Sequence, residues 1–287
     1  MKLYFPGIIL LFLFSVSCNN DQSVNRHDLV TRHNIENSII DSLNSLSVGN
    51  GEFAFTVDAT GLQTFPDFYK AGISLGTMSN WGWHSFKNPD NFNPEDNYRE
   101  YEVNGRNVKY LWQYGPGEDE RKSRASSWLR ENPHRIHLGM IGLQIVKKDG
   151  TEITIRDISG NVQRLDLWTG EIFSRFTVDG VPVQVTTVCH PEYDQISAKI
   201  ESGLITENRL RIKIHFPMGI PHPAAYDFNE PDRHVTNILS ETEGETCFER
   251  VQDDDRYYVK VKHNNGTLED ISPHLYHIVP GNDNPVY

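Results

Sequence analysis

Four residues in the stretch "NWGWHSF", residues 80–86, have side chains suited to holding a sugar. Trp81 and Trp83 offer flat apolar rings that pack against a pyranose CH face, while Asn80 and His84 offer hydrogen-bonding groups for hydroxyls. The same spacing is typical of a core strand, because Trp81 and Trp83 alternate around Gly82 and share one face. Two interpretations follow: an aromatic platform on a loop, or core and interdomain packing.

A second candidate contact lies in "LSVGNGEFAF", residues 46–55, where glycines flank Asn50. Glycine on both sides lets the backbone approach a ligand closely, so Asn50 joins the candidate binding residues. The alternation of Phe53 and Phe55 also predicts a simpler structure, a tight turn or bulge that leads into a core strand.

Established catalytic and metal-binding motifs do not accompany these residues. The sequence has no GxSxG, HExxH, P-loop or paired CxxC motif, and no GxGxxG after a strand. His134 and His137 would point to opposite faces of a strand, so we expect no metal site and no cofactor there. Residues 253–255 favour a solvated loop. The carboxylates Asp227, Glu230 and Asp232 are flanked by aromatic residues, and a structural role is favoured for them over a catalytic one. Glycosidic chemistry would need two carboxyl groups about 5 to 9 Å apart, which spacing alone does not establish.

Charge restricts the partners of this chain. It has 287 residues and a formal net charge of −12 at pH 7, which argues against nucleic acid because phosphate binding needs a cationic face. The same charge disfavours electrostatic docking on anionic lipid. Neutral or cationic partners fit, and the length allows one large domain or two ordinary ones.

The first 17 residues predict a secretory signal peptide, with Lys2, an apolar run over 8–14 and small residues before Cys18. Ser15-Val16-Ser17-Cys18 resembles a bacterial lipobox, in which the lipidated Cys18 becomes the first residue, although Ser15 replaces the usual leucine. A plain cleaved signal is the alternative. Residues 18–32 would form a tether. We expect an exported protein, periplasmic or anchored by a lipid in the outer membrane of a Gram-negative bacterium.

The elements that must position the candidate residues are predicted to be β-strands. Asp179-Gly180 separates two alternating runs, 171–178 and 181–190, and supplies the positive φ values of a tight hairpin turn. The same signal recurs at residues 104–105, 149–150 and 265–266. A helix is predicted over residues 117–132, and a short helix or surface strap over 34–46. Many short strands joined by such turns indicate a sandwich or barrel.

Two further features leave alternatives open. Cys189 and Cys247 form either one disulfide or two buried thiols. Residues 274–287 predict a strand, a turn at 280–283 and the beginning of another strand, which we interpret as a chain truncated within its sheet.

Longer stretches resemble a known group of enzymes. The matching segments are "LSVGNGEFAFTVDATGLQTF", "GISLGTMSNWGWHSFKNP", "WLRENPHRIHLGMIGL", "LDLWTGEIFSRFTVDGVPVQVTTVCHPEYDQIS" and "FPMGIPHPAAYDFNEPDRH". They resemble the N-terminal β-supersandwich of bacterial glycoside hydrolases whose sandwich precedes an (α/α)6 barrel, such as families 65 and 95. Uncharacterised Bacteroidetes-type members of this six-hairpin glycosidase superfamily look most similar.

The resemblance implies an all-β antiparallel supersandwich over residues 33–287, with one or two short helices. In such families the catalytic carboxyl group lies in the barrel, so no catalytic residue is expected in this chain. The leading interpretation is the sandwich domain of an exported glycoside hydrolase-like protein that acts in carbohydrate breakdown. This domain would position the glycan or form one wall of its binding site. The alternatives are a non-catalytic glycan-binding surface lipoprotein and the non-functional product of a decayed gene.

Overall fold

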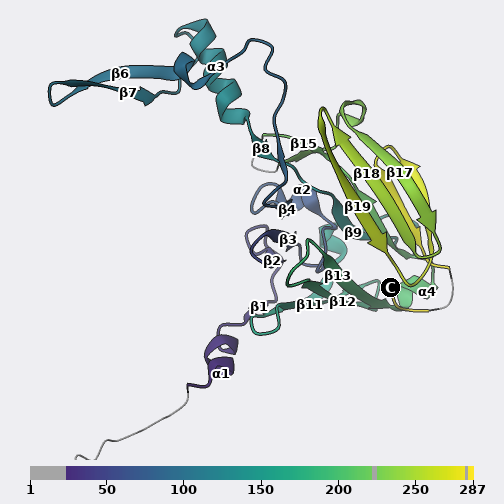
Figure 1. Ribbon diagram of the computed structural model, residues 1–287. Helices are drawn as coiled ribbons and strands as arrows, with labels where there is room; N and C mark the ends of the chain where they lie inside the picture. Colours follow the sequence, from purple (N-terminus) through teal and green to yellow (C-terminus); the bar gives the residue numbers. More distant parts are fainter. Residues whose placement is uncertain (1–23, 222–224, 282–283) are drawn as a thin grey trace, which may run out of the picture.

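The computed structural model describes residues 24–221, 225–281 and 284–287 (Figure 1). The predicted signal peptide and the proposed lipidation site Cys18 lie outside these residues. The described part is mostly β, in antiparallel sheets, which confirms the predicted fold class. None of the helices within it is long and apolar enough to cross a membrane.

The largest sheet has five antiparallel strands in the order β1-β10-β11-β12-β13. Its strands are β1 (Ile35–Asn37), β10 (Ser159–Asp166), β11 (Glu171–Val178), β12 (Val181–Cys189) and β13 (Ile196–Ser202). The predicted hairpin joins β11 to β12, and both turn residues, Asp179 and Gly180, have positive φ values of 51° and 82°. These values are the ones that an Asp-Gly turn supplies, so local chemistry sets the register of this hairpin.

Two further sheets supply the other walls of the core. A four-stranded sheet has the order β20-β21-β14-β9, and a three-stranded sheet has the order β17-β18-β19. Their strands are β9 (Met140–Ile145), β14 (Leu210–His215), β17 (Val235–Thr242), β18 (Glu245–Gln252), β19 (Asp255–Lys262), β20 (Thr267–Ser272) and β21 (Leu275–Val279). One apolar cluster joins all three sheets, with Phe176, Ile212 and Phe248 among its fully or almost fully buried members.

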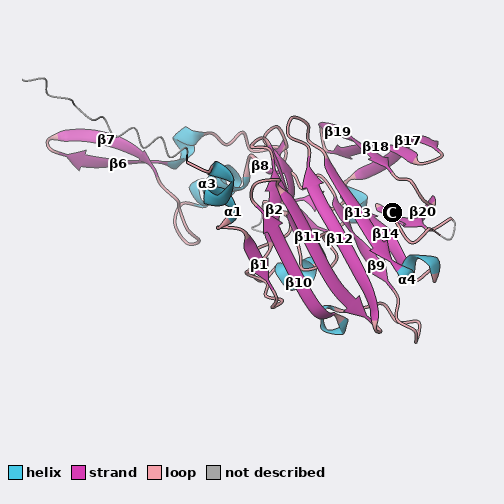
Figure 2. Ribbon diagram, turned by 90° about the horizontal axis from the view of Figure 1, so that it is seen from below, coloured by secondary structure: helices cyan, strands magenta, loops and turns pink. Residues whose placement is uncertain are grey.

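Shorter strands carry the candidate segments. β2 (Leu46–Gly49), β3 (Phe53–Val57) and β4 (Thr77–Ser79) form one sheet, and β5 (Trp83–His84) pairs with β8 (His134–Arg135). β15 (Met218–Gly219) pairs with β16 (Tyr226–Asp227). The hairpin of β6 (Tyr98–Val103) and β7 (Arg106–Leu111) turns at Asn104-Gly105, as predicted, and projects from the rest of the molecule (Figures 1 and 2).

Helix is scarce, as expected. The predicted helix is α3 (Glu120–Glu131), where the Asp119 side chain caps the N-terminus by accepting a hydrogen bond from the Lys122 backbone. The other helices are α1 (Arg26–Thr31), α2 (Pro66–Tyr69) and α4 (Gly203–Thr206), with 3₁₀ turns at Pro94–Asn97, Ile155–Asp157 and Pro231–Arg233. Residues 34–46 form β1 and turns, so the surface strap is confirmed there and the helix is not. The helix α1 lies within residues 18–32, for which we predicted a tether.

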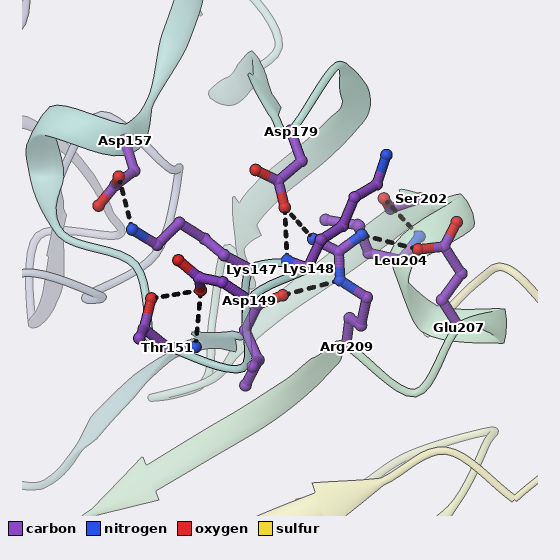
Figure 3. Close-up of polar contacts among 11 residues, drawn as sticks. Lys147, Lys148, Asp149, Thr151, Asp157, Asp179, Ser202, Leu204, Glu207 and Arg209 are labelled. Atoms are coloured by element: carbon purple, nitrogen blue, oxygen red, sulfur yellow. Dashed lines mark hydrogen bonds and ion pairs between the residues drawn. The ribbon is translucent and has the colours of Figure 1, made fainter.

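A polar network fixes the end of the β11–β12 hairpin (Figure 3). Arg209, just before β14, forms ion pairs with Asp179 in the hairpin turn and with Glu207, the latter at 2.8 Å. Lys147, two residues after β9, forms a further ion pair, with its Nζ 3.1 Å from Asp157 Oδ1. The network therefore links the five-stranded sheet to the four-stranded sheet through their turns.

A buried arginine fixes one face of the three-stranded sheet. Arg250 in β18 is 1% exposed and donates hydrogen bonds to the backbone oxygens of Pro217 and Val235, at 3.1 and 2.9 Å. His234 Nδ1 lies 2.6 Å from the guanidinium, and burial together with Arg250 lowers the pKa of His234 to about 3. A neutral imidazole can accept a hydrogen bond from the guanidinium here.

The two cysteines, Cys189 and Cys247, are half-buried free thiols, so the disulfide alternative is excluded in this structure.

Candidate functional site

The two tryptophans of "NWGWHSF" lie on the surface of the described molecule. Trp81 is 50% exposed in the turn after β4, and Trp83 is 44% exposed in β5. Gly82, between them, is buried and donates to Ser79 O at 3.1 Å. Alternation over residues 81–84 thus directs both rings outward and places Gly82 and His84 inside. The rings are not part of the core of this domain.

A carboxylate from a distant loop holds Trp81. Asp194 Oδ2 accepts one hydrogen bond from Trp81 Nε1 and another from Ser79 Oγ, each at 2.6 Å. The Trp81 ring is also tilted against the Tyr257 ring of β19, with centroids 6.1 Å apart. The polar edge of the indole is thereby satisfied inside the protein, and its exposed part is apolar ring surface.

Trp83 is held from its own neighbourhood. Its Nε1 donates to Asn80 O at 2.9 Å. The Arg135 guanidinium lies 4.0 Å from the Trp83 ring centroid, a cation–π contact across the β5–β8 pair. Arg135 Nη1 in turn donates to Ser79 O at 2.6 Å. Contacts within the protein therefore hold both tryptophan rings in place.

Asn80 directly precedes Trp81 in the sequence and is exposed. Its side-chain amide donates to the Glu52 carboxylate, and its backbone N–H donates to Glu52 O at 2.8 Å. Because the amide oxygen of Asn80 has no partner among the described residues, it is free to accept from a ligand.

Asn50 has an internal role in this structure. Its Oδ1 accepts from the backbone N–H groups of Glu52 and Phe53, at 3.0 and 2.9 Å. Its Nδ2 donates to the backbone oxygens of His190 and Tyr193, at 3.2 and 3.1 Å. These four bonds use the full capacity of the amide. Asn50 thus closes the turn between β2 and β3 and fastens the 190–195 loop that carries Asp194.

His84 points inward from the same strand. It is 1% exposed, and both ring nitrogens face carboxylates of the β18–β19 turn. Nδ1 lies 2.7 Å from Asp255 Oδ2, and Nε2 lies 3.2 Å from Asp253 Oδ2. His84 therefore joins β5 to the three-stranded sheet, and the outward surface is left to Asn80, Trp81 and Trp83.

Two cavities border the tryptophan segment. The first, of about 750 Å³, lies between the β2–β3 turn, the end of β4 and the segment around β8. Its lining includes Glu52, Asn80, Arg130, His134 and Arg135. Burial lowers the pKa of His134, so the positive charge at neutral pH comes from the two arginines. Three segments that the sequence singled out, 46–55, 72–89 and 216–234, meet at this cavity.

The second cavity has a volume of about 930 Å³ and reaches the tryptophan segment at Trp81. Trp81, Tyr193, Asp194 and Tyr258 are among the residues that line it, together with apolar side chains of β13 and β19. Tyr193 and Tyr258 are 63% and 59% exposed. Trp81, Tyr193 and Tyr258 thus contribute exposed aromatic surface to the lining of this cavity.

The residues that sequence reasoning missed are Asp194 and Arg135. Asp194 is separated from Trp81 by 113 residues, and no local pattern connects the two. Arg135 lies in "PHRIH", where the histidines drew attention. Its pairing opposite Trp83 follows only from the β5–β8 register. Within the described ranges, His, Cys, Asp and Glu side chains form no group of three that could hold a metal ion.

Comparisons with known proteins give little further guidance. No family model matches the chain, and no curated protein matches it. One similar solved structure is described as "Putative kojibiose phosphorylase from human microbiome", with a TM-score of 0.34 and 10% sequence identity. The alignment covers 86% of this chain and 32% of that chain, so this chain spans about a third of the length of that protein. At this TM-score the similarity assigns no function.

Proposed function

We propose that this chain is the sandwich domain of an exported glycoside hydrolase-like protein in carbohydrate breakdown, and that it positions or walls a glycan site. The observation that carries the proposal is the pair of outward tryptophan rings at positions 81 and 83. Both indole N–H groups are bonded internally, at 2.6 and 2.9 Å, while about half of each side chain is exposed. Rigid apolar rings of this kind suit the CH face of a sugar.

The expected gain from stacking is substantial. Covering ~100 Å² of ring surface with a sugar contributes roughly 2.5 kcal/mol at about 25 cal/mol per Å². Each ring is pre-organised by its internal contacts, so little side-chain entropy is lost on binding. Either tryptophan alone therefore accounts for a change of about 10-fold to 100-fold in affinity.

Polar groups beside the rings would orient the sugar. The free amide oxygen of Asn80 and the carboxylates of Glu52 and Asp194 accept hydrogen bonds from hydroxyls, and Arg135 donates to them. A net charge of −12 disfavours strongly anionic glycans. The substrate class that fits best is a neutral oligosaccharide.

The proposed role within a longer enzyme rests on the resemblance of the sequence to six-hairpin glycosidases. On this proposal the catalytic carboxyl group belongs to a following barrel, and the tryptophan surface forms one wall of the site. Export would follow from the signal peptide predicted over residues 1–17, and a lipid on Cys18 would hold the protein at the outer membrane.

The test is binding of neutral oligosaccharides to the purified chain without its predicted leader, by calorimetry over a panel of disaccharides and longer glycans. We expect Trp81→Ala and Trp83→Ala each to weaken binding at least 10-fold. Trp168→Ala is the matched control, because Trp168 is 51% exposed but packs against His27 and lines neither cavity.

Equal affinities for all three variants and the wild-type chain would show that the tryptophan surface does not bind sugar. Destabilisation by several kcal/mol in Trp81→Ala and Trp83→Ala, with unchanged affinity, would assign the rings to packing instead. Tight binding by this chain alone, without a following domain, would favour the glycan-binding lipoprotein over the enzyme domain.

A further inference from the structure

The β6–β7 hairpin projects from the sandwich and forms a two-stranded sheet by itself (Figures 1 and 2). Its strands pair in register around the Asn104-Gly105 turn. A two-stranded hairpin alone is marginally stable in water, whereas three or more strands with an apolar face are stable. Both strands of this hairpin have an outer edge that is available to a further strand.

The hairpin has two chemically different faces. Directly opposite residues share a face, and alternate residues of a strand return to it. One face carries aromatic, apolar and cationic side chains, among them Arg99, Tyr101, Arg106, Val108, Tyr110 and Trp112. The Arg99 guanidinium lies 4.9 Å from the ring centroid of Trp112 and 5.6 Å from that of Tyr101. Tyr110 and Trp112 are 52% and 41% exposed, so this face is largely uncovered in the single copy.

Hydrogen bonding within the hairpin decides which backbone groups remain free. Trp112 N donates to Asn97 O at 2.8 Å, in continuation of the hairpin register. Hydrogen-bonded and non-hydrogen-bonded pairs alternate in an antiparallel ladder, so the even-numbered residues of β7 direct their backbone groups toward β6. The N–H and C=O groups of Asn107, Lys109 and Leu111 therefore point outward along the free edge of β7. Within the described ranges, no backbone group pairs with them.

The outer edges of the two strands differ in charge. The outward backbone groups of β6 belong to Tyr98, Glu100 and Glu102. A twofold axis centred anywhere from residue 99 to residue 102 would bring like charges of two copies directly opposite each other, which is destabilising. The outer edge of β7 carries no carboxylate. Pairing of β6 with β7 of the next copy would not close and would give a filament. The β7 edge is therefore the edge that suits a second copy.

A twofold axis at Val108 gives the two β7 edges a complementary register. Val108 then lies opposite the partner's Val108, which is an apolar contact. Asn107 lies opposite the partner's Lys109, where the amide oxygen accepts a hydrogen bond from the ammonium. Arg106 lies opposite the partner's Tyr110, where the guanidinium packs on the ring. The outward backbone groups of Asn107 and Lys109 form the hydrogen bonds of this ladder.

Neighbouring registers are less favourable. An axis at Lys109 would place two ammonium groups directly opposite each other. An axis at Asn107 would leave only residues 106–108 of β7 paired with strand. An axis at Tyr110 would bring Arg106 opposite the partner's Tyr114, beyond the end of the hairpin, where the backbone N–H of Tyr114 is bonded to Ser126 Oγ of α3 at 2.9 Å.

We propose that the outer edge of β7 is an interface between two copies of this chain, in which their hairpins form one antiparallel sheet in the order β6-β7-β7-β6 about a twofold axis at Val108. This pairing is isologous and closed. The turn of each hairpin ends opposite the partner's Leu111 and Trp112, so the two sandwiches lie at opposite ends of the shared sheet. The aromatic faces of the two hairpins become one face of four strands. The interface goes beyond the proposed glycan binding and requires no sugar.

The test is sedimentation of the purified chain without residues 1–18. The ladder covers residues 106–110 of each copy, roughly 17 Å, which is short for a stable interface. We therefore measure over roughly a hundredfold range of concentration, up to several hundred micromolar, and expect a reversible dimer at the upper end.

Two proline variants identify the edge. Asn107→Pro removes an outward N–H of β7 but no hydrogen bond within the hairpin, so we expect it to weaken dimerisation about 10-fold or more. Glu102→Pro is the matched control, because Glu102 lies directly opposite Asn107 and loses an outward N–H of β6 instead. We expect this control to dimerise like the wild-type chain.

Cysteine variants test the register even if Asn107→Pro disrupts the hairpin. Two copies of Val108 on the axis have Cα atoms about 4.5 Å apart, within the range of a disulfide, so Val108→Cys should form an intermolecular disulfide in the presence of oxidised glutathione. Tyr110→Cys is the matched control on the same face of β7, where the two copies of residue 110 lie roughly 13 Å apart. The wild-type chain, with Cys189 and Cys247, gives the background of the assay.

A monomer at every concentration, or equal dimerisation of the two proline variants, would overturn the proposal. Cross-linking of Tyr110→Cys as strong as that of Val108→Cys would overturn the register about Val108.

Discussion

Replacing Asp194 tests whether one loop carboxylate positions Trp81. Asp194 Oδ2 accepts from Trp81 Nε1 and from Ser79 Oγ, each at 2.6 Å. A hydrogen bond to a charged group contributes about 1.5 to 3 kcal/mol when it is shielded, and less where water competes. Ser79 is 2% exposed, whereas Trp81 is 50% exposed. We therefore expect Asp194→Ala to lower the free energy of unfolding by about 2 kcal/mol, mostly through the Ser79 hydroxyl.

The assay combines urea unfolding with tryptophan fluorescence. Asp194→Asn is the matched variant, because its amide oxygen still accepts both hydrogen bonds but carries no charge, so a loss of about 1 kcal/mol is expected. Trp81→Phe keeps a ring and removes the N–H donor. In a double-mutant cycle with Asp194→Ala we expect a coupling energy of roughly 0.5 to 1 kcal/mol.

The reasoning fails if Asp194→Ala leaves both the free energy of unfolding and the Trp81 environment unchanged. It also fails if the cycle gives no coupling, since the two side chains would then be independent. Loss of sugar affinity in Asp194→Ala with Asp194→Asn largely unaffected would connect this hydrogen bond to the proposed binding surface.

Two further predictions concern the frame of the domain. A Cβ at Gly142 in β9 would lie 2.5 Å from Gln63 O, so Gly142→Ala should lower the free energy of unfolding by about 2 to 3 kcal/mol, because the backbone must shift. Gly203→Ala is the control and should be close to neutral, because the nearest atom to its Cβ would be 3.6 Å away. Urea unfolding measures both variants, and equal effects would show that the contact at Gly142 does not matter. Burial lowers the pKa of His137 to about 4, whereas in the unfolded state its pKa is near 6.5. Above pH 6.5 the imidazole is neutral in both states, so it does not change the stability. Between pH 6.5 and 4 only the unfolded state is protonated, so the free energy of unfolding falls by up to about 3 kcal/mol. His137→Gln should flatten that part of the pH dependence, and an unchanged slope would show that His137 is not its source.

Much of the fold was predictable from local patterns. The β11–β12 hairpin follows from Asp179-Gly180, and the β6–β7 hairpin follows from Asn104-Gly105, because these dipeptides adopt positive φ at low cost. The α3 helix follows from an acidic first turn and a stop before Pro133. The short α1 helix was missed, since six residues with no buried side chain give no periodic signal.

The candidate site was predictable only in part. The pattern around Trp81 and Trp83 shows that they share a face, but it leaves open whether that face is core or surface. The structure places both rings outside and assigns Asn50 and His84 to contacts within the protein. Asn50 contacts Tyr193, which lies 143 residues further along the sequence, and His84 contacts Asp255, which lies 171 residues further along. Spacing along the chain carries no information about such pairs.

By itself, the sequence determined the β class, the main hairpin turns, the α3 helix and the side chains suited to sugar binding. These depend on dihedral preferences and on alternation, which act over a few residues. Only the tertiary structure decided that Asp194 and Arg135 hold the tryptophans, and that β13 and β19 line one cavity. Such contacts arise from the packing of sheets whose strands lie far apart in the chain, because burial of apolar area is non-directional and selects partners by shape.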